Sequence, residues 1–173
     1  GAGLQLQANT HDIQVMNYAS WNATKYGIKC QAHNVELTNI QVFEPGVYGI
    51  SLQYNDVRLS NARVEKTVAG NAGAITISAP QQKSDPRNIC MELSNIHIVD
   101  TAGGFYTGLD ITNSESGTDP VSHVHVANLN ITGHAGLKYG LRIAGNVADC
   151  DIVNAHVTDC DTNIVMGAYN INS

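Results

Sequence analysis

Two repeated sequence patterns predict an all-β chain that is built of stacked coils, each made of three short strands. In the first pattern, apolar residues alternate with other residues on both sides of a central asparagine. The second pattern is shorter, opens on glycine and alternates apolar, polar and apolar residues. Because the two patterns alternate along the chain, we interpret the 173 residues as one array of repeats.

The asparagine pattern predicts two short strands joined by a bend. In residues 35–42, apolar side chains occupy every second position before Asn39, and the alternation resumes directly after it. Such alternation is typical of a strand that buries one face. Asparagine tolerates the left-handed backbone conformation better than most residues, so it suits a tight bend between two strands. Six segments follow the pattern: 13–20, 35–42, 57–64, 91–98, 124–131 and 150–157.

The glycine pattern predicts the third strand of each coil. A coil of about 22 residues cannot bury its inner face alone, so each strand should pair in parallel with its counterpart in the next coil. This arrangement is a parallel β-helix, here of about six to seven coils, the seventh beginning at Asn163. The pattern occurs six times, with Ala74 once replacing the glycine: 3–6, 27–30, 49–52, 74–77, 108–111 and 140–143.

Stacked coils also predict a ladder of asparagines. Neighbouring parallel strands lie about 4.8 Å apart, so the bend asparagines of successive coils become neighbours whose amides can hydrogen-bond to one another. The expected members are Asn17, Asn39, Asn61, Asn95, Asn128 and Asn154.

Composition narrows the function classes. The net charge is -6 and the nine basic residues are scattered, so the chain lacks the clustered Lys and Arg that nucleic-acid binding needs. No apolar run approaches the roughly 18 residues of a membrane span. No CxxC spacing occurs among the four cysteines, which we expect to be free thiols, and we expect neither a metal nor a cofactor. We expect residues 1–173 to form one domain, excised from a longer chain.

Two insertions interrupt the regular spacing. Asn17, Asn39 and Asn61 are 22 residues apart, but later coils are longer because of polar, Pro-containing loops at 79–88 and 113–121. Both loops follow first strands, so stacking should place them side by side as a wall beside the first-strand face. Long polar loops on a rigid scaffold are common places for binding sites.

The outward side chains of the first strands form a polar stripe with one carboxylate, Asp110. Glycoside hydrolysis needs two carboxylates, about 5 Å or about 6.5–9.5 Å apart, and the neighbouring loop supplies Glu115 and Asp119 as partners for Asp110. The alternative is that Asp110 forms a structural salt bridge with Arg142 in the next coil. The other expected contributors to a substrate groove are Lys29, Gln53, Thr76 and Arg142.

The coil pattern and the asparagine ladder, over about residues 3–166, resemble the right-handed parallel β-helix family of pectate lyases, polygalacturonases and phage tailspikes. The resemblance implies a binding groove over the first-strand face, beside loops such as the two inserted here. The signature motifs of polygalacturonases are not present. Residues 133–136 and 141–144 only partly match two of these motifs. By elimination, the chain looks most like a segment of a phage tailspike or tail fibre.

That resemblance implies a domain that binds, and degrades as a glycoside hydrolase, a bacterial surface polysaccharide. The expected setting is a homotrimer in an extracellular virion tail, with a secreted bacterial protein as the alternative. Two other functions stay open. One is a non-catalytic module that binds glycan or acts as a spacer, and the other is a polysaccharide lyase with Lys29 or Arg142 as its base.

Overall fold

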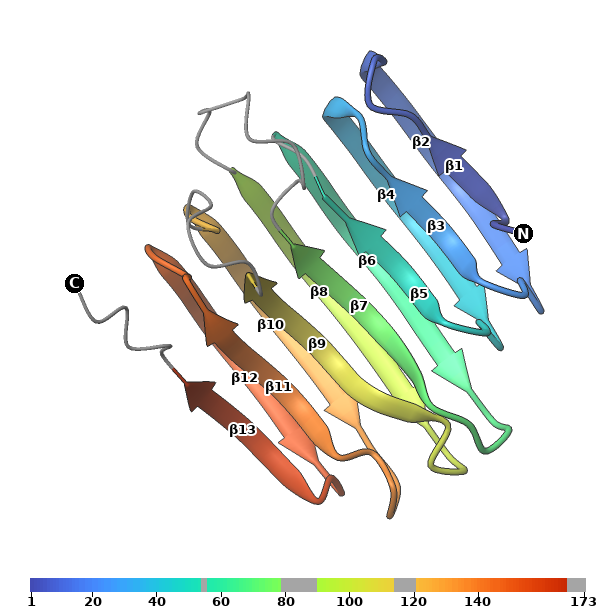
Figure 1. Ribbon diagram of the computed structural model, residues 1–173, viewed down its shortest axis with the longest axis vertical. Coiled ribbons are helices and arrows are strands. Elements are labelled where there is room, and N and C mark those ends of the chain that lie inside the picture. Colours follow the sequence, from blue (N-terminus) through green and yellow to red (C-terminus); the bar gives the residue numbers. More distant parts are fainter. Residues whose placement is uncertain (54–55, 79–89, 114–120, 168–173) are drawn as a thin grey trace.

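The computed structural model describes residues 1–53, 56–78, 90–113 and 121–167, and in these residues the chain is all β, with thirteen strands and no helix. Successive strands alternate between two parallel sheets that face each other (Figure 1). One sheet holds the odd-numbered strands and the other the even-numbered strands, each in the order of the chain.

The odd sheet has seven strands and the even sheet has six. The odd strands are β1 (Leu4–Leu6), β3 (Tyr26–Cys30), β5 (Tyr48–Leu52), β7 (Ala72–Ser78), β9 (Phe105–Asn113), β11 (Tyr139–Gly145) and β13 (Thr162–Gly167). The even strands are β2 (His11–Trp21), β4 (His33–Phe43), β6 (Val57–Lys66), β8 (Met91–Asp100), β10 (Val124–Thr132) and β12 (Cys150–Thr158).

Every strand pairs in parallel with the strand two places along the chain, as the stacked-coil prediction requires. Ile28 of β3 pairs with Ile50 of β5, and Leu37 of β4 pairs with Leu59 of β6, so equivalent positions of successive repeats are neighbours. The prediction of three strands per coil was wrong in one respect. The two short strands around each asparagine form one strand that continues through the bend, so each coil contributes two strands.

The asparagine ladder is confirmed. The six bend asparagines all have a left-handed backbone, with φ between 53° and 57°. Each amide Nδ2 donates to the Oδ1 of the preceding member over 3.0 to 3.3 Å. The five hydrogen bonds satisfy side chains at a bend where the ladder of backbone hydrogen bonds is interrupted. They join Asn39 to Asn17, Asn61 to Asn39, Asn95 to Asn61, Asn128 to Asn95 and Asn154 to Asn128.

The core lies between the sheets and explains the glycines that open the first strands. Aliphatic side chains such as Ile28, Leu37 and Ile75 are fully buried there. A Cβ atom on Gly49 would lie 2.5 Å from Cγ1 of Val64 and 2.5 Å from the carbonyl oxygen of Ala74. Glycine is therefore required at this position because Val64 of the facing sheet and the backbone of the neighbouring strand both approach closely, and not because of a positive φ.

A second column of left-handed residues stands where the even strands begin, and the sequence analysis missed it. It contains Asp12, Asn34, Asp56, His123 and Asp149, with φ between 50° and 58°. Asp and Asn favour this conformation, but the residue type varies from coil to coil, so no single repeated letter marks the column.

The two predicted loops lie largely outside the described residues, 79–88 entirely. At the edges of the second loop the prediction needs correction, because Asn113 is the last residue of β9 and Val121 forms a parallel bridge with Val147.

Candidate functional site

A row of polar residues crosses the outer face of the odd sheet, with one residue from each of the five strands from β3 to β11. The strand register places Lys29 next to Ser51, Ser51 next to Thr76, Thr76 next to Asp110, and Asp110 next to Arg142. We call these five residues the polar row. The structure thus brings together four of the predicted site residues, the first and last of which lie more than 100 residues apart in the sequence.

The polar row is less accessible than the sequence analysis expected. Thr76 is 7% exposed and Asp110 is 8% exposed, and Ser51 is buried as well. Strand alternation predicts which way a side chain points, but not what else covers that face of the sheet. The open part of the row is its two ends, where Lys29 is half-buried and the Arg142 side chain is 33% exposed.

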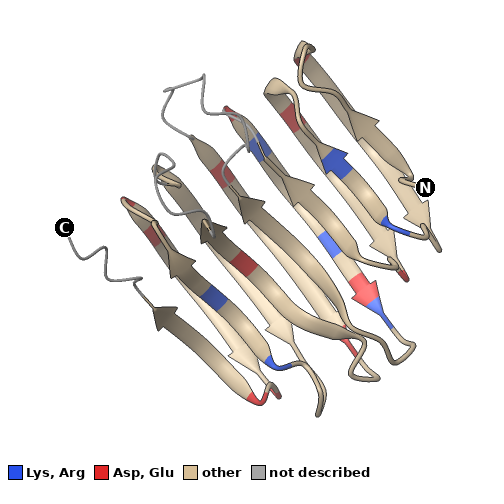
Figure 2. Cartoon of the chain, viewed as in Figure 1, with Lys and Arg blue, Asp and Glu red and all other residues tan. Residues whose placement is uncertain are grey.

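Asp110 and Arg142 form an ion pair, as the structural alternative predicted. Arg142 Nε lies 3.7 Å from Asp110 Oδ1, and Figure 2 shows the acidic position of β9 beside the basic position of β11. Among the described residues, Asp110 Oδ1 has no hydrogen-bond partner although it is buried. Burial raises the pKa of the Asp110 carboxyl above its ordinary value, and the nearby Arg142 charge opposes this.

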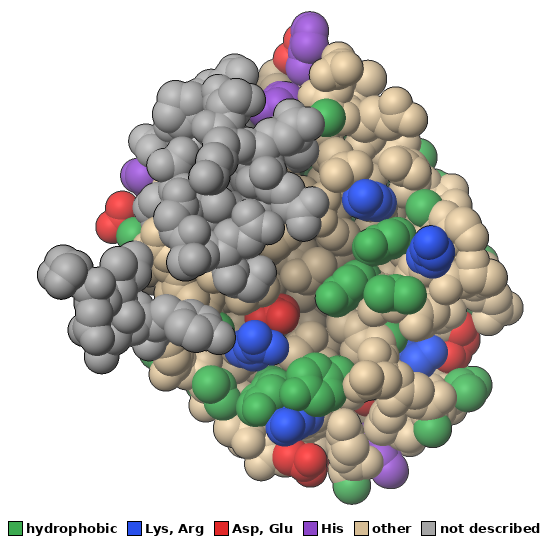
Figure 3. Space-filling view, viewed as in Figure 1, with side chains coloured by type: hydrophobic (Ala, Val, Ile, Leu, Met, Phe, Trp, Pro, Cys, Tyr) green, Lys and Arg blue, Asp and Glu red, His purple; other side chains and the backbone are tan. Residues whose placement is uncertain are grey.

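An aromatic and cationic cluster borders the ion pair. The rings of Tyr106 and Tyr139 meet edge to face, with centroids 5.6 Å apart and planes at 86°. Lys138 Nζ lies 5.2 Å from the Tyr106 centroid and 5.3 Å from the Tyr139 centroid, while Arg142 Cζ lies 5.9 Å from the Tyr139 centroid. Figure 3 shows acidic and basic side chains over β9 and β11, with hydrophobic side chains next to them.

The repeat pattern alone did not predict that Tyr106 and Lys138 lie beside Tyr139. It started this strand at Gly108, whereas β9 begins at Phe105 and so carries Tyr106 into the sheet. Lys138 directly precedes β11, outside the pattern that was used. The only available signal was the aromatic residue before the first-strand glycine.

A second aromatic pair lies at the other end of the same sheet. Tyr26 and Tyr48 stack with centroids 5.9 Å apart and planes at 18°, and Lys29 Nζ lies 5.6 Å from the Tyr26 centroid. Gly73 is the register partner of Tyr48 in the next strand. A Cβ on Gly73 would lie 2.6 Å from the Tyr48 ring, so glycine makes room for it.

The remaining predicted residues have other surroundings. Gln53 follows β5, and its Oε1 accepts a hydrogen bond of 2.8 Å from Gln31 Nε2, so its amide is engaged within the stack. Glu115 and Asp119, the expected carboxylate partners of Asp110, lie outside the described residues.

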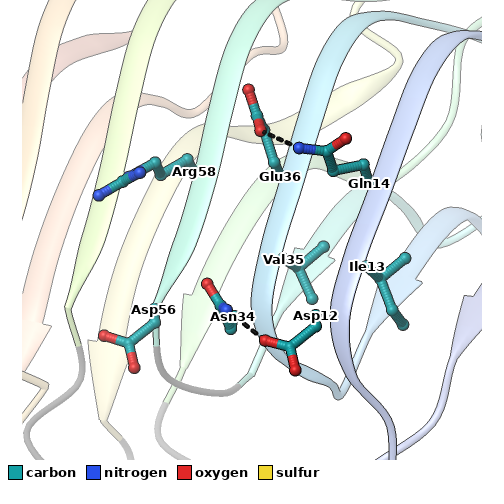
Figure 4. Close-up of a pocket in the computed structure, with 8 residues that line it drawn as sticks. All are labelled: Asp12, Ile13, Gln14, Asn34, Val35, Glu36, Asp56 and Arg58. Atoms are coloured by element: carbon teal, nitrogen blue, oxygen red, sulfur yellow. Dashed lines mark hydrogen bonds between the residues drawn. The ribbon is translucent and has the colours of Figure 1, made fainter.

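A shallow hollow of about 290 Å³ lies on the outer face of the even sheet, away from the polar row (Figure 4). Asn34 donates to Asp12, and Gln14 Nε2 donates to Glu36 Oε2 over 3.0 Å. Arg58 also reaches Glu92, with its Nε 3.2 Å from Glu92 Oε2. The polar groups of the hollow therefore mostly bind one another. Its lining is Asp12, Ile13, Gln14, Asn34, Val35, Glu36, Asp56 and Arg58.

Histidines on the same sheet pair with carboxylates of the next coil. His125 Nδ1 lies 3.1 Å from Asp151 Oδ2, and His123 Nε2 lies 3.8 Å from Asp149 Oδ2. Across residues 1–53, 56–78, 90–113 and 121–167, no three His, Cys, Asp or Glu side chains are grouped so that they could hold a metal ion. The same residues include no helix with the length and apolarity needed to span a bilayer.

The arrangement on the odd sheet is suited to binding a polar, ring-shaped molecule. Tyrosine rings offer flat apolar surfaces, and lysine, arginine and carboxyl groups beside them offer hydrogen bonds and charge. Comparison with known proteins found no matching family model, no matching curated protein and no matching solved structure. A functional assignment therefore depends on the geometry of this face.

Proposed function

We propose that this chain is a polysaccharide-binding domain with a right-handed parallel β-helix fold, and that the glycan binds on the outer face of the odd sheet. The observation that carries the proposal is the cluster of Tyr106, Lys138 and Tyr139 beside the Asp110 and Arg142 ion pair. The cluster joins aromatic surface to charged hydrogen-bonding groups on a rigid scaffold.

The chemistry of sugars fits this combination. A pyranose ring has apolar C–H faces that can pack on a tyrosine ring, and hydroxyl groups around its edge that need hydrogen-bond partners. Arg142 presents a planar guanidinium with several donors, which suits paired sugar oxygens. Tyr106 is 37% exposed, so part of its ring is open to a ligand.

The fold assignment is supported by strand order and pairing. Each coil adds one strand to each parallel sheet, in the same order and direction throughout. Parallel strands joined by crossovers have right-handed connections in almost all proteins, which favours the right-handed form. The continuous asparagine ladder further supports a single solenoid.

One observation favours glycoside hydrolysis as a second candidate function. Burial raises the pKa of Asp110, which is the property that a general acid in such a reaction requires. In this candidate, Asp110 is the acid and Glu115 or Asp119 supplies the second carboxylate. Residence in a phage tailspike, trimer formation and a bacterial surface polysaccharide as ligand stay predictions from the resemblance.

Binding can be tested with purified bacterial surface polysaccharides by affinity electrophoresis. We expect at least one polysaccharide to retard the protein, and Tyr139→Ala to weaken that binding about tenfold or more. Trp21→Ala is the matched control, because Trp21 is an exposed aromatic residue on the even sheet, and it should leave binding unchanged. No retardation by any polysaccharide, or full binding by Tyr139→Ala, would contradict the proposal.

Catalysis is tested separately by following reducing ends released from the bound polysaccharide. Release that is lost in Asp110→Asn supports hydrolysis, whereas binding without release leaves a non-catalytic domain. An absorbance from an unsaturated sugar would identify a lyase instead.

A further inference from the structure

We propose that Asp110 and Arg142 form a proton-gated anion subsite, in which protonation of Asp110 frees the Arg142 guanidinium to bind the carboxylate or sulfate group of an acidic sugar. This inference rests on the proposed function, because it specifies the charge of the glycan and the pH dependence of its binding. The two groups come from adjacent strands of the odd sheet, β9 and β11.

The geometry of the pair suits a contact that is released by protonation better than a permanent salt bridge. Arg142 Nε and Asp110 Oδ1 are 3.7 Å apart, which is beyond hydrogen-bond distance. The two groups also differ in access to solvent. Counting side-chain atoms alone, Asp110 is 11% exposed and Arg142 is 33% exposed. The guanidinium can therefore reach a ligand at the surface while the carboxyl beside it stays largely buried.

Arg142 is the charged group that faces Asp110 among the described residues. The register partner of Asp110 on β7 is Thr76, which carries no charge, and its partner on β11 is Arg142. Its neighbours on β9 that point into the core are the apolar Leu109 and Ile111. Within the described strands, the charges paired across β9 and β11 at this end of the polar row are therefore one carboxyl and one guanidinium.

Electrostatics give the direction of the effect. An ionised Asp110 neutralises Arg142 and repels an incoming anion, and both interactions are strong because the carboxyl is shielded from water. A protonated Asp110 leaves the positive charge of Arg142 unopposed and gains a donor that can hydrogen-bond to an anionic oxygen. Burial raises the pKa of Asp110, so the protonated form is reached at higher pH than for an exposed aspartate.

The surroundings also favour an anion. Lys138, beside Tyr139, and Lys29, at the other end of the polar row, add positive charge to this face. The chain as a whole carries a net charge of -6, so the basic character of this face is local. A neutral glycan would use the tyrosines but would gain nothing from this charge.

The test is an NMR titration of the protein with sodium D-glucuronate and, as the matched neutral probe, D-glucose, at constant ionic strength. As the pH falls toward the raised pKa of Asp110, we expect glucuronate affinity to rise, by at most about tenfold per pH unit, which is the limit for one linked proton. Glucose affinity should not change with pH. The Arg142 Nε–H resonance should move with glucuronate and not with glucose.

Two variants test whether Asp110 causes the pH dependence and whether Arg142 binds the anionic group. Asp110→Asn should bind glucuronate with an affinity that does not depend on pH, and Arg142→Gln should lose the preference for glucuronate over glucose. Sodium sulfate provides a third arm, because sulfate that displaces glucuronate shows that the anionic group is what Arg142 recognises. If Asp110→Asn fails to fold, the pH dependence of the unaltered protein together with Arg142→Gln decides the question.

Glucuronate affinity that is independent of pH, or equal to that of glucose, would overturn the inference. The proposed function is tested separately, by the retardation of the protein in polysaccharide and by the binding of the Tyr139→Ala variant. Retention of that binding together with no glucuronate preference would reject the anion subsite alone, whereas loss of all polysaccharide binding would reject the proposed function.

Discussion

The side-chain amide of Asn95 donates from Nδ2 to Oδ1 of Asn61 over 3.0 Å, although 34 residues separate the two asparagines. Asn61 and Asn39 are also neighbours in the ladder, yet only 22 residues separate them. The longer repeat therefore preserves the bend geometry, and its additional residues do not disturb the register of the even sheet. A coil can gain residues between strands because the stacking positions are fixed by pairing.

Asn61→Ala should lower the free energy of unfolding by about 2 to 4 kcal/mol. The change removes one hydrogen bond to Asn39 and one from Asn95, each worth about 1 kcal/mol net, and places alanine in the left-handed region at a further cost of about 1 kcal/mol. Urea unfolding followed by far-UV circular dichroism measures the loss.

Asn61→Gly and Asn22→Ala separate the two contributions. Glycine adopts the left-handed conformation without strain. The loss of stability in Asn61→Gly should therefore come mainly from the missing hydrogen bonds. Asn22 has a φ of 52° but is not a member of the ladder, so Asn22→Ala should show mainly the backbone cost. Equal losses for Asn61→Ala and Asn22→Ala would show that the ladder hydrogen bonds add no stability.

The parallel stack was predictable because its two determinants are local and repeated. Alternation marks the buried face of each strand, and one asparagine per repeat marks the bend, as Asn39 illustrates. The column that contains Asp12 and Asn34 was not predictable, since several residue types adopt the left-handed conformation there. Sequence spacing identifies a repeated letter, but it does not identify a repeated backbone conformation that different residues share.

Gly49→Ala should destabilise the fold even though it adds only one methyl group. The new Cβ would lie 2.5 Å from both Val64 Cγ1 and the carbonyl oxygen of Ala74, and a backbone oxygen cannot move away cheaply. Overpacking of this kind typically costs about 1 to 3 kcal/mol. Gly167→Ala is the control, because a Cβ there meets nothing within 4 Å, and it should leave the urea midpoint almost unchanged. Equal midpoints for the two variants would contradict the packing argument.

Cys30 should resist alkylation in the folded protein. Its side chain is fully buried, and burial raises the pKa of its thiol to about 11, so very little thiolate forms near pH 8. Cys90 is only partly buried, and iodoacetamide should modify it first. Mass spectrometry of the modified peptides, with and without urea, measures the order. Modification of Cys30 as fast as Cys90 without urea would place Cys30 outside the core.

The sequence predicts which residues of the site are neighbours across strands, but it does not predict how deeply they are buried. Placing Asp110 beside Thr76 and Arg142 required only the repeat and the parallel pairing, both of which are visible in the sequence. The near-complete burial of Thr76 and Asp110 depends on how the whole outer face is covered, and alternation carries no information about that. The position of Lys138 was not predictable either, because Lys138 precedes β11 and lies outside the repeated pattern.

Asp110→Asn should change how stability depends on pH, and the sign follows from proton binding. Because the folded pKa of Asp110 is raised, the native chain holds more protons at this site than the unfolded chain does between the ordinary and the folded pKa. The stability contributed by Asp110 is therefore fully present below the ordinary pKa and is lost as pH rises through the folded pKa. Asparagine does not titrate, so the variant should gain stability relative to the unaltered protein as pH rises from the ordinary pKa of an aspartate to the raised pKa of Asp110.

Asp12→Asn supplies a control of opposite sign. Hydrogen bonds from His11 and Asn34 lower the pKa of Asp12, so its contribution is present above the ordinary pKa and is lost as pH falls through the folded pKa. Asp12→Asn should thus lose stability relative to the unaltered protein as pH rises from the lowered pKa of Asp12 to its ordinary pKa, which is a more acidic range than for Asp110→Asn. The loss should be slight because Asp12 is exposed. Urea midpoints measured at several pH values test both variants. A stability difference for Asp110→Asn that stays constant, or that falls as pH rises, would mean that water or Arg142 compensates for the burial of this carboxyl.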